Sequence, residues 1–138
     1  MTLIVINKCY GGFGLSHAAV MKYAEKKKMK LYPFVNGRKE NGMIDFNTWV
    51  PYDGKSEGHI HYSKKPIKTS KGLNDAYFSE RDISRDDPAL VAVVKEMGMK
   101  ANGDCAKLSI VKIPDGIKWE ISEYDGMESV EEVHRSWY

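Results

Sequence analysis

The sequence predicts a mixed α and β fold of the α+β class, with one small sheet in a single domain spanning residues 1–138. Three observations predict it. A short β-branched run at residues 3–6 leads through a glycine loop into an amphipathic stretch. A second amphipathic stretch occupies about residues 87–98, and period-two alternation follows between residues 108 and 121.

The opening unit is predicted as strand, glycine loop and helix. Residues 3–6 form a run that is short and continuous enough for a buried strand, which we expect at the centre of the sheet. Residues 9–16 contain three glycines and end in Ser16, a good helix N-cap. The helix after it has apolar positions at helical spacing, namely Ala19, Val20, Tyr23 and Ala24.

The middle of the chain is less regular. Residues 31–35 predict a second strand, which Pro33 should push to a sheet edge because proline lacks a backbone donor. Asn36-Gly37 should then turn the chain. Residues 36–80 predict an irregular, lysine-rich excursion or hairpin outside the sheet, with short extended candidates at residues 46–50 and 59–62.

The second half predicts a helix, a C-terminal β-hairpin and a short last helix. Asp86-Asp87-Pro88 is a favourable helix start, and Gly98 should end that helix. Strands at residues 108–113 and 117–121 should pair around the turn at 114–116. Residues 129–137 should close the chain as a helix.

Composition excludes several classes of protein. The chain is 42% hydrophobic with a formal net charge of +2, so no global field favours polymeric nucleic acid or a membrane surface. No apolar run is long enough for a membrane span or an export signal. The two cysteines, Cys9 and Cys105, make no disulfide framework and lack clustered zinc-site spacing, which suits a reducing cytosol. We predict no cofactor, no metal and no catalytic residue.

The glycine loop is the first candidate binding site. Backbone amides at Gly11 and Gly12, close to a helix N-terminus, can cradle phosphate or carboxylate, and Tyr10 or Phe13 can stack on a base. The loop lacks the lysine and serine of a Walker phosphate loop and the spacing of a dinucleotide fingerprint. The simpler interpretation is that the glycines only permit a tight strand-to-helix turn.

Arginine is the second candidate, since the chain has only four and guanidinium suits phosphate. Arg81 and Arg85 flank acidic residues, so ion pairing that closes the loop over the helix start is the alternative interpretation. Arg135 has the same ambiguity.

Two further groups are ambiguous. His59 and His61 would share one face of a strand, as metal ligands sometimes do, but chance surface histidines are the simpler interpretation. Acidic residues around the last strands could serve acid–base chemistry or only solubility. They are Glu120, Glu123, Asp125 and Glu128.

Both ends of the chain resemble a family of small bacteriophage proteins. The opening run, residues 4–16, reads INKCYGGFGLS after Ile4-Val5, and the later blocks lie at residues 85–88, 101–103, 113–115, 119–126 and 134–137. The lysine-rich middle is unmatched. We expect this family to include the phage sponge that counters the Thoeris defence by sequestering its cyclic ADP-ribose signal, with relatives that hold the cyclic oligonucleotides of CBASS defence.

The resemblance implies a homo-oligomeric binder in the host bacterial cytoplasm that captures a cyclic nucleotide signal without cleaving it. The residues expected to line its pocket are Asn7, Tyr10, Gly11, Gly12, Phe13, Arg81, Arg85, Asn102 and Arg135. A nucleotide-processing enzyme that uses the acidic hairpin is one alternative. A protein inhibitor that binds a host defence protein through the middle segment is the other.

Overall fold

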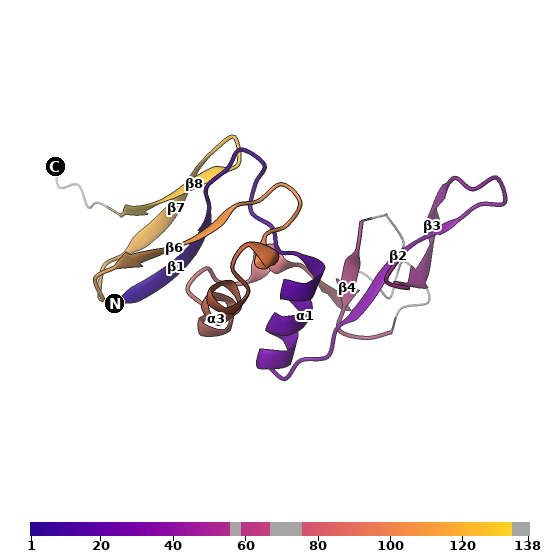
Figure 1. Cartoon of the computed structure of the whole chain (residues 1–138), viewed down its shortest axis with the longest axis horizontal. Coiled ribbons are helices and arrows are strands. Elements are labelled where there is room, and N and C mark those ends of the chain that lie inside the picture. Colours follow the sequence, from indigo (N-terminus) through magenta and orange to yellow (C-terminus); the bar gives the residue numbers. More distant parts are fainter. Residues whose placement is uncertain (56–58, 67–75, 134–138) are drawn as a thin grey trace. The chain divides into compact units, whose positions relative to one another are not determined.

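The structure is a computed structural model that describes residues 1–55, 59–66 and 76–133 (Figure 1). It confirms the mixed α+β class, with helices, antiparallel strands and a C-terminal hairpin, but the described strands form three sheets and not the one small sheet predicted. The chain divides into two compact units. The first combines Met1–Lys27 with Ile83–Tyr138, and the second is Lys28–Asp82. That the whole chain folds as one domain stays a prediction.

The core of the first unit forms around β1 (Thr2–Asn7). This strand pairs antiparallel with β6 (Leu108–Ile113), in a register from Thr2↔Ile113 to Asn7↔Leu108. Ile4, Val5 and Ile6 are buried, as the β-branched run predicts. On its other side β1 meets Arg85, whose carbonyl accepts a hydrogen bond from the Val5 amide at 2.8 Å.

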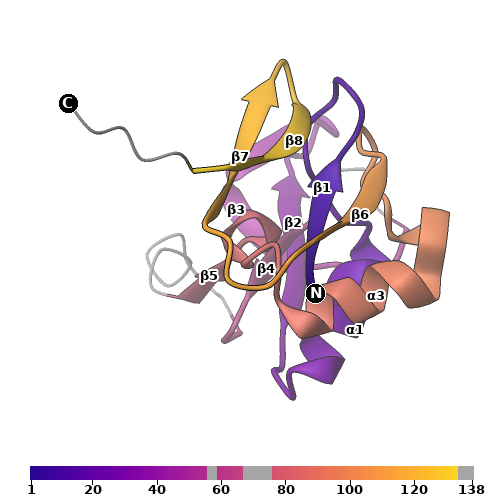
Figure 2. The same cartoon turned by 90° about the vertical axis from the view of Figure 1, so that its left-hand side faces the viewer.

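Two capped helices belong to the same unit, and the second of them packs on this strand pair. In α1 (His17–Lys26) the Ser16 hydroxyl accepts from the Ala19 amide at 3.2 Å. In α3 (Pro88–Met97) the Asp87 carboxylate accepts from the Ala89 amide at 2.8 Å, and Pro88 occupies the first turn. Both N-caps therefore confirm the sequence prediction. Helix α3 packs on β1, β6 and α1 (Figure 1, Figure 2), and the short 3-10 helix η2 (Gly98–Ala101) follows it.

The C-terminal hairpin differs from the predicted one in its strands. β7 (Trp119–Tyr124) pairs with β8 (Met127–Glu132) and not with β6. Its turn residues, Asp125 and Gly126, both have positive φ, at 49° and 89°, which matches the tight hairpin turn that Asp-Gly favours. β6 pairs with β1 instead, and hydrogen bonds from the N-terminus and Thr2 to Asp115 hold the following turn against the start of β1.

The helix predicted at residues 129–137 is wrong over its described part. Residues 129–132 belong to β8, because the Asp125-Gly126 turn sends the chain back along β7 and gives these backbone groups a ladder partner. Val130 and Val133 are spaced as on one face of a helix, and this local pattern gives no information about the pairing of β8 with β7. Residues 134–137 lie outside the described residues.

The second unit contains a four-stranded antiparallel sheet in the order β3-β2-β4-β5. Its strands are β2 (Tyr32–Arg38), β3 (Ile44–Pro51), β4 (His61–Ser63) and β5 (Tyr77–Phe78), and the 3-10 helix η1 (Glu80–Asp82) follows them. The extended candidate at residues 46–50 lies within β3, and the one at 59–62 overlaps β4, which begins at His61. The segment is more regular than the sequence predicted.

Two local predictions in this sheet are wrong. Pro33 lies in an interior strand, not at an edge, because its missing donor falls just beyond the last β2–β3 pair, Phe34↔Pro51. Its carbonyl still accepts from the Tyr52 amide at 3.0 Å. Asn36-Gly37 lies inside β2, and the chain turns later, where the Lys39 amide donates to the Met43 carbonyl at 2.8 Å.

Candidate functional site

The glycine loop of the first unit is packed against two other turns. A Cβ atom at Gly11 would lie 1.9 Å from the Cys105 carbonyl oxygen, and one at Gly126 would lie 2.5 Å from the Gly12 amide nitrogen. Gly12 itself has φ of 93°, which side chains disfavour. Phe13 is buried, whereas the Tyr10 side chain is 63% exposed. The glycines therefore permit close backbone packing, and Tyr10 remains accessible.

Asn7, at the end of β1, joins these segments. Its amide nitrogen Nδ2 donates to the carbonyls of Cys9 and Gly126, both at 2.7 Å. Its Oδ1 accepts from the Lys107 amide at 2.8 Å. The residue is wholly buried, so three chain segments meet at a single side chain whose polar groups are satisfied.

Arg85 occupies the centre of the same region. Its guanidinium donates to both oxygens of Glu128, at 2.6 and 2.9 Å, and lies 3.6 Å from the centre of the Phe13 ring. Glu128 Oε1 also accepts a hydrogen bond from the Asn7 backbone amide at 2.8 Å. The ion-pair interpretation of Arg85 therefore describes what is observed, although the partner is Glu128 and not a nearby aspartate.

Five predicted pocket residues thus come together in what we call the glycine-loop cluster. They are Asn7, Gly11, Phe13, Arg85 and Asn102. The Asn102 Oδ1 accepts a hydrogen bond from the Leu108 backbone amide at 2.9 Å. Tyr10 and Gly12 lie on the same loop. Arg81 lies in η1 of the second unit, and Arg135 lies outside the described residues. Roles for all nine in ligand binding stay predictions.

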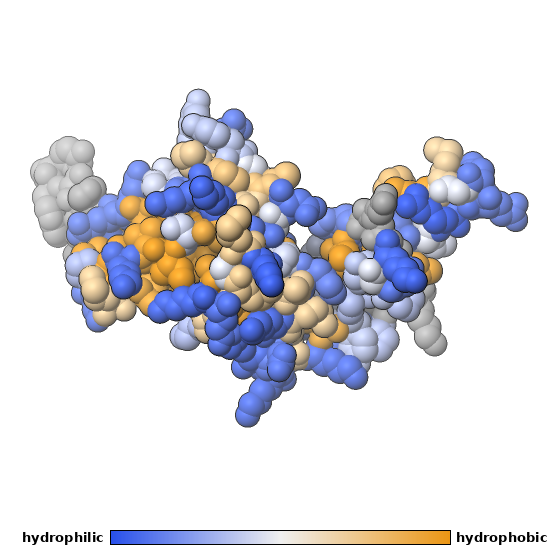
Figure 3. Space-filling view, viewed as in Figure 1, coloured by the Kyte–Doolittle hydropathy of each residue, from blue (hydrophilic) through white to orange (hydrophobic). Residues whose placement is uncertain are grey.

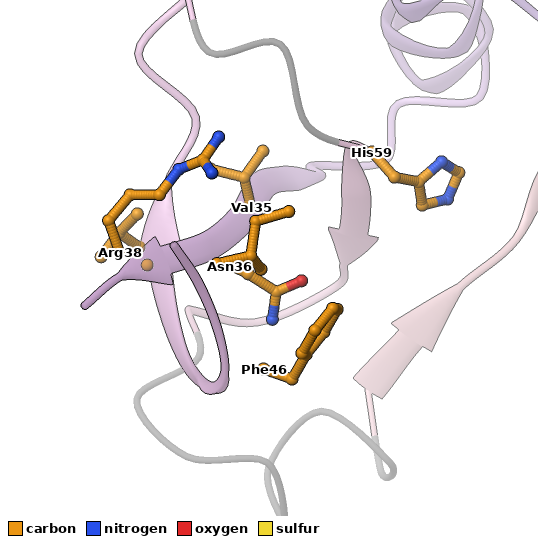
Figure 4. A pocket seen from close by; sticks show the side chains of 8 residues that line it. Val35, Asn36, Arg38, Phe46 and His59 are labelled. Carbon is orange, nitrogen blue, oxygen red and sulfur yellow. The ribbon is translucent and has the colours of Figure 1, made fainter. Parts of the chain in front are cut away.

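A different pocket lies in the second unit, where β2 and β3 fall out of register (Figure 4). Asn36 pairs with Trp49, but the next residue, Gly37, pairs with Asp45, so residues 46–48 bulge out of β3. A Cβ atom at Gly37 would lie 2.4 Å from the Thr48 Oγ1, so a larger residue there would force the Thr48 side chain to move.

The bulge pocket, as we call it, has an apolar wall and a polar rim. Its volume is about 260 Å³, and Figure 4 shows Arg38 and His59 drawn on either side of Val35. The residues that line it are Val35, Asn36, Gly37, Arg38, Ile44, Phe46, Val50 and His59. The Phe46 side chain is 73% exposed. A phenylalanine, an asparagine and an arginine thus line a single cavity.

Aromatic rings stabilise the sheet next to this pocket. His61 stacks on Phe34 with ring centres 5.6 Å apart, and Trp49 meets His61 edge-on at 5.2 Å. The ring of His59 lies 4.6 Å from that of His61. Burial, and then the neighbouring His59, lowers the pKa of His61, which favours its neutral form.

The described parts of the chain hold no group of three histidine, cysteine or acidic side chains placed as metal ligands would be. None of the described helices is long and apolar enough to cross a membrane. With this geometry in view, comparison with family models, curated proteins and solved structures gives no match.

Sequence reasoning missed Arg38 and Phe46 as site residues. The available signal was Gly37, since an isolated glycine within an extended run often marks a bulge, and bulges are common beside functional sites. Asn36-Gly37 instead favoured a turn. The size of the register shift depends on the pairing of β2 with β3, which no local pattern specifies.

Proposed function

We propose that the protein captures a nucleotide-derived signal and holds it without cleaving it, as a phage anti-defence sponge would. The observation that carries the proposal is the bulge pocket, whose lining includes the exposed Phe46 together with Arg38, Asn36 and His59. Stacking on an aromatic ring, together with a cation for phosphate, is how proteins hold nucleotides without base-specific chemistry.

The size of the pocket indicates how much of such a ligand it would enclose. Small-molecule sites commonly measure roughly 300–1,000 Å³, and this cavity measures about 260 Å³. It suits a single base, with Phe46 on one face and the Asn36 amide towards its edge. The phosphates would then extend along Arg38.

A protein that captures its ligand without turnover needs only groups that bind the ligand. A sponge works by stoichiometry, so it needs affinity and abundance and no activated nucleophile. The resemblance of both chain ends to phage proteins supports a cyclic ADP-ribose isomer or a cyclic oligonucleotide as the signal and the host bacterial cytoplasm as its place of action.

The homo-oligomer implied by the same resemblance is part of the proposal. Figure 3 shows apolar surface over the face of the first unit that carries β1 and β6. The apolar residues of β6 are all only half-buried, namely Leu108, Ile110, Val111 and Ile113. A second copy that covers them would bury that surface.

A second candidate function is inhibition of a host protein. The β2–β3 hairpin exposes several large apolar side chains, and exposed apolar clusters often mark protein contacts. They are Met43, Ile44, Phe46 and Val50. In that case the protein would bind its target and ignore small nucleotides.

Substitution of Phe46 tests the proposed function once thermal-shift screening of cyclic nucleotides has found a ligand. Phe46→Ala should weaken binding by roughly 5- to 150-fold, since base–aromatic stacking contributes about 1–3 kcal/mol. The matched control is Tyr124→Ala, an equally exposed aromatic in the first unit, which should leave affinity unchanged. Equal affinity in both variants would remove the bulge pocket from the proposal.

A further inference from the structure

The two cysteines of the chain, 96 residues apart, lie side by side in the first unit. The Cys9 sulfur is 2.8 Å from the Cys105 carbonyl oxygen and 3.3 Å from Asn7 Oδ1. Neither cysteine takes part in the site proposed above. Both are free thiols, Cys9 partly buried and Cys105 exposed.

Backbone contacts hold the two segments at this spacing. The Gly103 amide donates to the Gly14 carbonyl at 3.0 Å, and the Lys8 amide donates to the Lys107 carbonyl at 2.8 Å. Between them, Gly11 packs so closely that an added Cβ atom would lie 2.4 Å from the Cys105 Cβ. The residues on both sides of each cysteine are therefore tied together, independently of the sulfurs.

We propose that Cys9 and Cys105 are a disulfide site that closes when the protein meets a peroxide or a small-molecule disulfide. The proximity of the Cys9 sulfur to the Cys105 backbone means that rotation of the exposed Cys105 side chain can bring the sulfurs into bonding range without opening the β1–β6 ladder. In a reducing compartment such a bond forms transiently, in response to oxidation.

The chemistry with peroxide balances as two thiols and one peroxide giving one disulfide and two waters. The exposed Cys105 thiolate attacks one peroxide oxygen, the O–O bond breaks, and a sulfenic acid and the first water form. The Cys9 thiolate then attacks that sulfur, the S–O bond breaks, and the hydroxide leaves with a proton as the second water. Two electrons pass from the sulfurs to the peroxide. With oxidised glutathione, the Cys105 thiolate displaces one glutathione thiol to form a mixed disulfide, and the Cys9 thiolate then displaces the second, so one protein disulfide and two glutathione thiols result.

The bond would fasten the glycine loop to the turn before β6. It would link residue 9 to residue 105 and so constrain the unfolded chain over a long loop, which raises the melting temperature. The same cross-link would fix the backbone around Gly11 and Gly12, where the sequence predicts anion binding.

The test is oxidation of the full chain with oxidised glutathione, followed by trypsin digestion without reductant. Trypsin cuts after Lys8, Lys22, Lys100 and Lys107, so the expected product is peptide 9–22 joined to peptide 101–107. Intact mass should fall by two hydrogen atoms, both free thiols should disappear, and the melting temperature should rise and return with reductant.

Two single variants complete the test. Cys9→Ser keeps a hydrogen-bonding group at position 9 and should accumulate a stable glutathione adduct on Cys105, because the resolving thiol is gone. Cys105→Ser changes an exposed residue and should give no internal cross-link. A wild-type protein that gives only glutathione adducts, or only disulfides between molecules, would overturn the proposal.

Discussion

At the scale of single residues, Arg85 satisfies several partners at once. Its guanidinium pairs with Glu128, donates to the Val5 carbonyl at 3.3 Å and covers the Phe13 ring. Only 5% of the Glu128 side chain and 16% of the Arg85 side chain are exposed. A buried pair of this kind is costly to break, because the remaining charge has no solvent to replace its partner.

Arg85→Met is therefore expected to lower the free energy of unfolding by about 3–5 kcal/mol in urea denaturation. The double variant Arg85→Met with Glu128→Met should recover much of that loss, because it removes both charges. Lys26→Met is the control, since its partner Glu96 is exposed and solvent screens such a pair, so its loss should change stability little. Similar losses for Arg85→Met and Lys26→Met would refute the structural role of Arg85.

Asp87 links the pH dependence of stability to the packing of α1 on α3. Burial raises the pKa of its carboxyl, but hydrogen bonds from Tyr23, the Ala89 amide and Lys27 outweigh burial and lower the pKa below its ordinary value. The Tyr23 hydroxyl donates to it at 2.9 Å, and burial followed by that bond raises the pKa of Tyr23 to about 12.

Because the folded pKa of Asp87 is lowered, its stabilising contribution is present above about pH 4 and is lost as pH falls through the folded value. Asp87→Asn should therefore be less stable than wild type at pH 7, and the two stabilities should converge as pH falls towards 3. Thermal unfolding across this range measures both. A constant difference between the two proteins would contradict the assignment.

Caps and ion-pair partners differ in how far they could be predicted. Ser16 and Asp87 act on amides within three residues, so the sequence was enough to identify both helix starts. The Arg85–Glu128 pair spans 43 residues, and Asn7 bonds to Gly126 across 119. Partners so far apart in sequence are brought together only by folding. Because the sequence does not show these partners, the polar side chains of Asn7, Arg85 and Asn102 were predicted to bind a ligand.

At the scale of elements, the glycine loop depends on close backbone approach. Gly11→Ala would force a Cβ atom against the Cys105 carbonyl and should lower the free energy of unfolding by about 1–3 kcal/mol. Tyr10→Ala, next to it in the loop and exposed, should change it by about 0.5 kcal/mol or less. Chemical denaturation compares them, and an unaffected Gly11→Ala protein would show that the loop does not need this contact.

Strand positions were predicted better than strand partners. Alternation located β6 and β7, but it could not show that β6 pairs with β1 across the whole chain. Asp125-Gly126 was a usable local signal for the β7–β8 turn, and the apolar spacing at Val130 and Val133 led instead to a helix. Periodicity reports one face of an element and does not identify what covers it.

At the scale of the whole molecule, the chain separates its two candidate sites between two compact units. The glycine-loop cluster, which includes part of the sequence on which the predicted phage-family resemblance rests, belongs to the first unit. The bulge pocket belongs to the second, within the segment where no motif was found. The bulge pocket is present because β2 and β3 shift register once, at Gly37. In the sequence, the only sign of that shift was the glycine itself.

The most direct test of nucleotide capture is a calorimetric titration of the full chain with cyclic ADP-ribose isomers and cyclic di- and trinucleotides, followed by heat release and chromatography of the ligand. We predict saturable binding of at least one of these nucleotides, with the bound compound recovered chemically unchanged. Recovery of a converted product would indicate a nucleotide-processing enzyme. The absence of binding across the panel would contradict nucleotide capture and favour the protein-inhibitor alternative.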